Sequence, residues 1–340
     1  MNRRNFLFNT AMLSGIFLPS SPALATPSTP GLIKPRPLKK GDKVAIMAPA
    51  GAVFSPKHID KVCDALKELG LEAVKGKSLY QQHGYLAGKD KDRAKEFNQF
   101  MGDKDINGIL AIRGGWGCAR MLPYIDYELA RKNPKMVMGM SDITALLLAL
   151  YQKSSLVTFH GLVGYASWNE FSVEHFQRTV MTNEMYTLIN DTSTEEEAYT
   201  IRPGVVEGEL VGGNLTVLSG LIGSPYIPDW KGKILFLEDL NEDPYRIDRM
   251  LTHLKISGVL DQISGFIFGN CRKCVSDDPA ASFSLSELFL DHIYPLKIPA
   301  YYGANIGHIT NKFSLPVGVK VQMDAKKHTL TYLETPMLEA

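Results

Sequence analysis

The sequence lacks an excess of charge of either sign. Its 37 lysines and arginines stand against 36 aspartates and glutamates, a formal net charge of +1 over 340 residues. Binding to nucleic acid or to an anionic membrane surface depends on clustered basic residues. We therefore expect no nucleic acid and no membrane surface among the partners. Hydrophobic residues make up 45% of the chain, enough for a folded protein of about two domains.

Long apolar runs are also missing, because no stretch after residue 25 reaches the roughly 18 apolar residues of a membrane-spanning helix. Residues 1–25 have the parts of a signal peptide: Arg3 and Arg4, a short apolar stretch over 6–18, and a small-residue cleavage site at 23–25. The paired arginines favour the twin-arginine type over a general secretory signal. We expect a periplasmic protein with no membrane anchor in its mature form, and a proline-rich linker at 26–37.

Cysteine is scarce, with four residues in the chain, and no further ligands stand near enough to complete a zinc site. Cys271 and Cys274 form a Cys-x-x-Cys pair that follows a predicted strand and lacks the context of a thioredoxin motif. In an oxidising compartment they form either a structural disulfide or two free thiols. Redox catalysis is the weaker interpretation.

Internal repeats and low-complexity segments are absent after the linker, and the first half of the chain alternates strands with helices. Apolar runs predict strands at 43–48, 71–74, 106–112 and 136–140, and helical spacing predicts helices at 56–69, 90–101 and 143–151. This alternation is typical of a doubly wound, mostly parallel, Rossmann-like α/β domain, in which sites lie at the carboxyl ends of the strands. We place this domain at 38–165.

The second half of the chain is different. Short strands are predicted at 208–211, 233–237, 265–268, 319–323 and 329–333, with a helix at 244–257. We therefore expect a second, β-rich α+β domain at 206–340, joined to the first by a linker at 166–205 that contains some helix.

Ser141 lies where the predicted strand 136–140 meets the next helix. At such a turn a serine hydroxyl stands above the sheet, and the amide of the next residue, Asp142, points into the same space. This arrangement suits a nucleophile with an oxyanion donor beside it. The alternative is an ordinary N-cap serine, since Ser-Asp before an apolar run is a common helix start.

A glycine run follows the neighbouring strand at 113–117, where Gly114 and Gly115 allow backbone N–H groups to approach a ligand closely. The run has neither the Gly-Lys-Ser/Thr ending of a phosphate-binding loop nor the spacing of a dinucleotide-binding loop. It is therefore either a second source of oxyanion donors or a simple turn. Cys118 beside it has no evident partner that would stabilise a thiolate, which argues against a cysteine nucleophile.

A hydrolytic serine also needs a base, and two of the eight histidines have suitable positions. His308 lies in a glycine-flanked loop after a predicted strand, and His160 ends another apolar run. The orienting carboxylate is equally open, because four acidic residues follow the predicted strand 233–237: Glu238, Asp239, Glu242 and Asp243. The residues alone do not choose among them.

Several segments together resemble the LD-carboxypeptidase family of serine peptidases, which also includes the microcin C immunity peptidases. They cover nearly the whole chain after the linker, in the family's order: 38–49, 113–126, 139–144, 235–251, and Gly307-His308 with 315–318. By this resemblance Ser141 is the nucleophile, His308 the general base and acid, and Glu238 the carboxylate that orients the imidazole. The active site would lie between the two domains.

The resemblance also implies the oxyanion donors, which are the amide of Asp142 and one from Gly114 or Gly115. The implied reaction releases the terminal D-alanine from the diamino acid of murein tetrapeptides through an acyl-enzyme, without a metal or cofactor. Family members commonly form homodimers, so a homodimer is expected. On charge alone, Arg113 and Arg246 are candidates for binding the terminal carboxylate, with a purely structural role as the equal alternative for both.

Two rival interpretations keep the fold. In the first, the substrate is a peptidyl-nucleotide toxin of the microcin type; export argues against it, because that toxin is processed in the cytoplasm. In the second, the protein binds murein peptides without cleaving them, which the intact set of Ser141, Glu238 and His308 disfavours.

Overall fold

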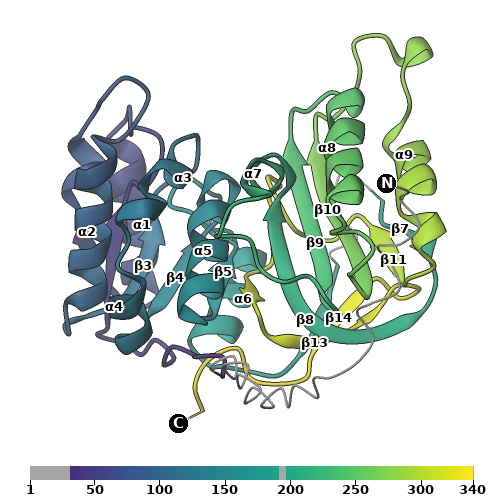
Figure 1. Ribbon diagram of the computed structural model, residues 1–340. Helices are drawn as coiled ribbons and strands as arrows, with labels where there is room; N and C mark the ends of the chain where they lie inside the picture. Colours follow the sequence, from purple (N-terminus) through teal and green to yellow (C-terminus); the bar gives the residue numbers. More distant parts are fainter. Residues whose placement is uncertain (1–30, 191–196, 340) are drawn as a thin grey trace, which may run out of the picture. The chain divides into compact units, whose positions relative to one another are not determined.

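The computed structural model describes residues 31–190 and 197–339, so the predicted signal peptide lies outside the described residues. Within these ranges the chain forms two sheets, each covered by helices (Figure 1). The strands are β1 Lys43–Met47, β2 Glu72–Lys75, β3 Ile106–Ala111, β4 Met136–Gly139, β5 Thr158–His160, β6 Thr187–Ile189, β7 Tyr199–Arg202, β8 Val205–Asn214, β9 Ile234–Leu240, β10 Gly265–Arg272, β11 Ala300–Tyr302, β12 Leu315–Val317, β13 Lys320–Asp324 and β14 Thr329–Tyr332.

The α-helices are α1 Lys57–Glu68, α2 Asp90–Gly102, α3 Cys118–Met121, α4 Tyr127–Lys132, α5 Thr144–Ser154, α6 Glu170–Val180, α7 Leu215–Leu221, α8 Pro244–Ile256 and α9 Leu285–His292. Among the described residues, none of these helices combines the length and the apolar composition that crossing a bilayer requires.

The first sheet has the strand order β12-β5-β4-β3-β1-β2, and β1 to β5 run parallel. Its central strands are mostly buried, because helices cover both faces of the sheet. Ile59 of α1 and Phe176 of α6 belong to the core on one face, whereas Phe97 of α2 and Leu146 of α5 belong to the core on the other. The predicted doubly wound, mostly parallel architecture is confirmed.

The second sheet has the order β6-β14-β13-β8-β9-β10-β11-β7. Its central strands β8, β9, β10 and β11 run parallel, and antiparallel strands lie on both sides of them. Helices α7, α8 and α9 connect these central strands and share one core with the sheet. The predicted second part, rich in strands and mixed with helices, is confirmed.

Two segments take places that the sequence did not indicate. The segment 166–205, predicted as a linker, contains α6 and supplies β6 and β7, the edge strands of the second sheet. Edge strands this short carry little apolar pattern, since only Leu188 is buried in β6. Strand β12 lies along the chain between β11 and β13 of the second sheet, yet it pairs antiparallel with β5 of the first sheet, with Leu315 opposite His160.

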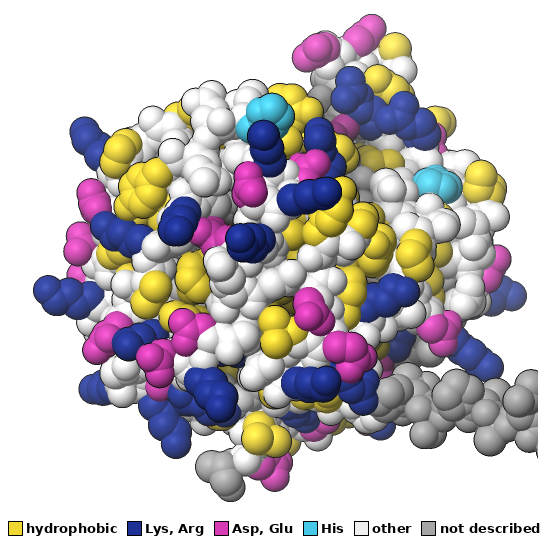
Figure 2. Space-filling model, turned by 60° about the vertical axis from the view of Figure 1, so that its left-hand side comes forward, with side chains coloured by type: hydrophobic (Ala, Val, Ile, Leu, Met, Phe, Trp, Pro, Cys, Tyr) yellow, Lys and Arg dark blue, Asp and Glu magenta, His cyan; other side chains and the backbone are white. Residues whose placement is uncertain are grey.

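The surface has mixed charge. Figure 2 shows acidic and basic side chains interspersed over one face of the molecule. This distribution agrees with the balanced composition.

Candidate active site

Ser141 lies in a strained turn, separated from the end of β4 only by Met140. Its φ angle is +61°, the left-handed region that a serine seldom adopts. The turn is tight, because a Cβ added to Gly139 would fall 2.6 Å from Cγ2 of Ile143. The N-cap positions of this turn and of α5 belong to Met140 and Ile143, so the alternative of an N-cap serine is wrong. Such strain clusters at functional sites and presents a side chain above the sheet.

Gly114 follows β3 and packs against this turn. A Cβ added to Gly114 would lie 2.8 Å from Cβ of Ser141, 3.0 Å from its Oγ and 3.1 Å from the amide nitrogen of Asp142. Gly115 comes next with a φ of +112°, which a residue with a side chain rarely adopts. The structure therefore brings the predicted nucleophile and all three predicted backbone donors to one place.

The side chain of Asp142 points away from this place into the interior. Its Oδ2 accepts a 2.7 Å hydrogen bond from the amide of Cys118, and burial raises the pKa of the carboxyl to about 6. Burial, reinforced by the charge of Asp142, also raises the pKa of the Cys118 thiol well above its ordinary value. Cys118 is therefore a buried thiol, unsuited to nucleophilic attack.

His308 and Glu238 form a pair near the carboxyl end of β9, a central strand of the second sheet. Glu238 lies near the end of β9, completely buried, and its Oε2 is 2.8 Å from Nδ1 of His308. Gly307 permits this approach, because a Cβ there would fall 2.9 Å from the same oxygen, and its φ is +116°. The bond to the carboxylate favours the tautomer that donates from Nδ1, which leaves Nε2 able to accept a proton.

The two partners shift each other's pKa. Burial alone would lower the pKa of His308, but the charge of Glu238 and the hydrogen bond to it raise the pKa above its ordinary value. Burial would raise the pKa of Glu238, and the charge of His308 and the same hydrogen bond lower it instead. Glu238 therefore stays ionised and stabilises a positive charge on the imidazole.

His160, the alternative base, is unsuited to that role. It ends β5 with 1% of its surface exposed, and neither ring nitrogen has a hydrogen-bond partner within the described ranges. Burial lowers its pKa to about 4. The other candidate carboxylates are likewise used elsewhere, since Asp243 caps α8 and Glu242 lies 3.8 Å from Arg246.

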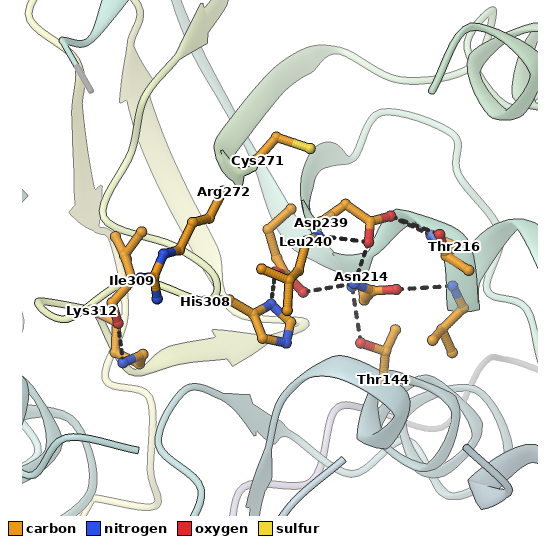
Figure 3. Close-up of polar contacts among 12 residues, drawn as sticks. Thr144, Asn214, Thr216, Asp239, Leu240, Cys271, Arg272, His308, Ile309 and Lys312 are labelled. Atoms are coloured by element: carbon orange, nitrogen blue, oxygen red, sulfur yellow. Dashed lines mark hydrogen bonds and ion pairs between the residues drawn. The ribbon is translucent and has the colours of Figure 1, made fainter. Parts of the chain in front are cut away.

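Asn214 connects the two sheets behind the site, and the sequence reasoning missed it. Its Nδ2 donates to Oε1 of Glu238 at 3.2 Å and to Oδ1 of Asp239 at 3.1 Å. Its backbone amide donates to Oγ1 of Thr144, at the start of α5 (Figure 3). Asp239 also accepts from Thr216, and burial with the charge of Glu238 raises its pKa to about 6. The only signal in the sequence was a polar residue between a strand and a helix.

Two cavities meet at Ser141 and His308, which line both. The larger has a volume of about 520 Å³ and is lined also by Gly114, Tyr165 and the basic residues Arg113, Arg272 and Lys312. The smaller, of about 230 Å³, is lined also by Trp116 and by the acidic residues Asp142, Asp239 and Glu242. Arg246 lines neither cavity, so this candidate for carboxylate binding is wrong.

The cysteine pair lies on either side of Arg272 in the sequence, a residue that lines the larger cavity. Cys271 and Cys274 form a disulfide at the end of β10, with a Cα separation of 5.4 Å. This finding decides between the two alternatives left open by the sequence. In the part of the chain that the structure describes, no group of three or more histidine, cysteine or acidic side chains could hold a metal ion.

Comparisons with known proteins agree with this architecture. Residues 44–161 match the model of the LD-carboxypeptidase N-terminal domain, and residues 207–323 match that of the C-terminal domain. A probable murein peptide carboxypeptidase of Bacillus subtilis is 38% identical over 301 residues, 87% of this chain and 93% of that protein. The structure of a muramoyltetrapeptide carboxypeptidase from Oxalobacter formigenes covers 85% of this chain and 97% of its own, at 28% identity and a TM-score of 0.74.

The microcin C7 self-immunity protein MccF of Escherichia coli is 30% identical over 329 residues, 88% of this chain and 95% of that protein. A structure of an inactive MccF mutant in the apo state covers 90% of this chain and 100% of its own, at 27% identity and a TM-score of 0.82. Another MccF structure is a complex with aspartyl sulfamoyl adenosine. Since both domain models match in order and relatives match along most of their length, the chain belongs to the LD-carboxypeptidase family of serine peptidases.

Proposed function

We propose that this peptidase hydrolyses the bond between the terminal D-alanine and the diamino acid of murein tetrapeptides, with Ser141, His308 and Glu238 as its catalytic triad. One observation carries the proposal: the buried Glu238–His308 pair and the strained Ser141 come from different sheets and open on the same cavity. A base oriented by a carboxylate next to an exposed hydroxyl is the arrangement of a serine hydrolase.

In the proposed mechanism, Nε2 of His308 takes the proton from Oγ of Ser141 as that oxygen attacks the scissile carbonyl carbon. Glu238, ionised and bonded to Nδ1, stabilises the imidazolium that results. The amide of Asp142 and an amide of Gly114 or Gly115 donate to the oxyanion. His308 then gives its proton to the departing amine of D-alanine. Water activated by the same imidazole hydrolyses the acyl-enzyme.

The substrate is proposed from the relatives, whose names specify murein peptides and muramoyltetrapeptide. The cavity is compatible with a short peptide, since about 520 Å³ lies in the range of small-molecule sites. The similarity to MccF favours a second candidate, a peptidyl-nucleotide. The disulfide between Cys271 and Cys274 favours the murein peptide, because such bonds persist in the oxidising compartment where murein lies.

The deciding experiment incubates the purified enzyme with disaccharide tetrapeptide, pentapeptide, tripeptide and an aspartyl-adenylate analogue. Release of D-alanine from the tetrapeptide alone, followed by mass spectrometry, is the expected result. Release of nucleoside in its place would favour the second candidate, and no release from any substrate would overturn the proposal. Ser141→Ala should lose turnover and keep tetrapeptide binding, measured by calorimetry. Surviving turnover in this variant would refute the nucleophile.

We further propose export through the twin-arginine pathway, supported by the arginine pair in the sequence and by the disulfide. Replacing Arg3 and Arg4 together by lysine should leave the precursor inside the cell, as fractionation and immunoblotting would show. Unchanged export would indicate a general secretory signal. The homodimer remains a prediction, which light scattering on the purified protein would check.

A further inference from the structure

A carboxypeptidase must recognise the free carboxylate of its substrate. In the terminal residue only the amide nitrogen and one α-carbon separate this carboxylate from the scissile carbonyl. Its receptor must therefore line the same cavity as the nucleophile. Three cationic side chains line the larger cavity with Ser141 and His308, namely Arg113, Arg272 and Lys312.

Two of these cations already have partners. Lys312 donates its Nζ to the carbonyls of Ile309 and Thr310 in the loop after His308, and burial lowers its pKa to about 8. Arg113 donates to the carbonyl of Ala52 at 3.1 Å, and its guanidinium lies 5.4 Å from the centre of the Tyr165 ring. Both side chains therefore hold loops of the site in place.

Arg272 differs from them, because its guanidinium has no hydrogen bond or ion pair to any residue the structure describes, although the side chain lines the cavity. Figure 3 shows the side chain leaving the end of β10 and extending toward Ile309, on one side of His308. The guanidinium of arginine is always charged, and its planar fork fits a carboxylate with two parallel hydrogen bonds.

The backbone of Arg272 is firmly held. Cys271 directly precedes it and Cys274 stands two residues after it, and these two cysteines are buried and joined by the disulfide. Its carbonyl accepts a 2.9 Å hydrogen bond from the amide of Asn241, and the amide of Cys274 donates to the carbonyl of Cys271. The exposed cation thus projects from a loop that is closed covalently and anchored to the sheet. Fixing a receptor in advance reduces the entropy lost on binding.

We propose that Arg272 is the receptor for the terminal carboxylate of the substrate, and that the Cys271–Cys274 disulfide positions it. This inference rests on the proposed peptidase function. It places the terminal D-amino acid of the substrate in the larger cavity, beside Ser141 and His308.

The test compares two substrates, the disaccharide tetrapeptide and the same molecule ending in D-alaninamide, which lacks the negative charge. The enzymes are wild type, Arg272→Met, Arg272→Lys and the matched control Arg131→Met, whose residue lies on α4 and lines neither cavity. In Arg272→Met, kcat/KM for the tetrapeptide with its free carboxylate (the acid) should fall roughly 10- to 100-fold, the effect expected from losing a hydrogen bond to a charged group. The kcat/KM for the substrate that ends in D-alaninamide (the amide) should change little. Arg272→Lys should recover part of the loss, and Arg131→Met should resemble wild type.

The decisive quantity is the ratio of kcat/KM for acid to that for amide. A ratio near one in Arg272→Met supports the inference. A ratio equal to that of wild type, which means equal losses on both substrates, overturns the inference and leaves the peptidase function standing. Absence of D-alanine release by wild type would overturn the peptidase function itself, and the inference with it. Thermal unfolding separates misfolding from lost recognition, since an exposed side chain should leave the midpoint unchanged.

Reduction tests the role of the disulfide. In Cys271→Ser/Cys274→Ser, or in wild type treated with a phosphine reductant, KM for the acid should rise and kcat should be retained. The same treatment of Arg272→Met should have no further effect on KM. If reduction raises KM equally in both enzymes, the disulfide does not act through Arg272.

Discussion

Replacing Gly114 by alanine tests the closest contact in the site. The new Cβ would stand 2.8 Å from Cβ of Ser141, whereas carbon atoms pack at about 3.5 to 4.0 Å. Roughly 1 Å must therefore be absorbed by moving the serine turn or the glycine loop. No positive φ value is associated with Gly114, so an alanine there has no backbone penalty of the left-handed kind. The perturbation is thus confined to the packing of Ser141, the proposed nucleophile, against the proposed oxyanion donors.

A displacement of about 1 Å in a reacting group lowers the rate about 100-fold, which equals about 2.7 kcal/mol in the activation barrier. Overpacking should lower the free energy of unfolding by roughly 1 to 3 kcal/mol. Both are measured on one preparation, by D-alanine release and by urea unfolding. Gly102→Ala is the control, because its Cβ would meet Leu129 at an ordinary 3.5 Å. Activity within about threefold of wild type would refute the close packing of Gly114 on Ser141.

Other predictions concern the carboxylates. His308 must be neutral to act as a base, so kcat/KM of the wild type should fall as the pH drops through the raised pKa of His308. The variant Glu238→Gln removes the charge that raises this pKa. The acidic limb of its pH profile should therefore shift to lower pH, and its activity should be lower at every pH. If the acidic limb does not shift, it reports the ionisation of a group other than His308. Asp142→Ala removes the acceptor of the buried Cys118 amide and should lower the free energy of unfolding by about 1 to 3 kcal/mol in urea titrations, and no loss would contradict the 2.7 Å bond.

The elements that alternate along the chain were predictable because their signals are local. Apolar runs and helical spacing indicated β1 to β4, α1 and α2 within one residue, and α5 with an end three residues too early. The positions of β6, β7 and β12 were not predictable from the sequence. Strands of three or four residues contain too few alternating positions to specify their partner strands. Pairing of this kind depends on contacts between residues far apart in sequence.

The residues of the site likewise divide into those with a local signal in the sequence and those without one. The turn chemistry of Ser141 was local and detectable, but the choice between Glu238 and Asp239 was not. Both residues are buried, so burial does not distinguish them, and what differs is the partner: His308 for one and Thr216 for the other. Those partners come from distant segments. Arg272 escaped notice for the same reason, because a cavity formed by both sheets gives it its surroundings.

Strand β12 has a consequence for how the enzyme reaches its active form. It lies seven residues after His308 and completes the edge of the first sheet, so the segment that carries the histidine is fastened to the sheet that carries Ser141. A fragment that ends before residue 315 would expose the edge of β5, which invites aggregation. The first sheet is therefore complete only when residue 317 has left the ribosome. Expression of residues 38–165 alone should yield an insoluble product. Ser141 and His308 are therefore held on one framework only after the segment that follows His308 has been synthesised.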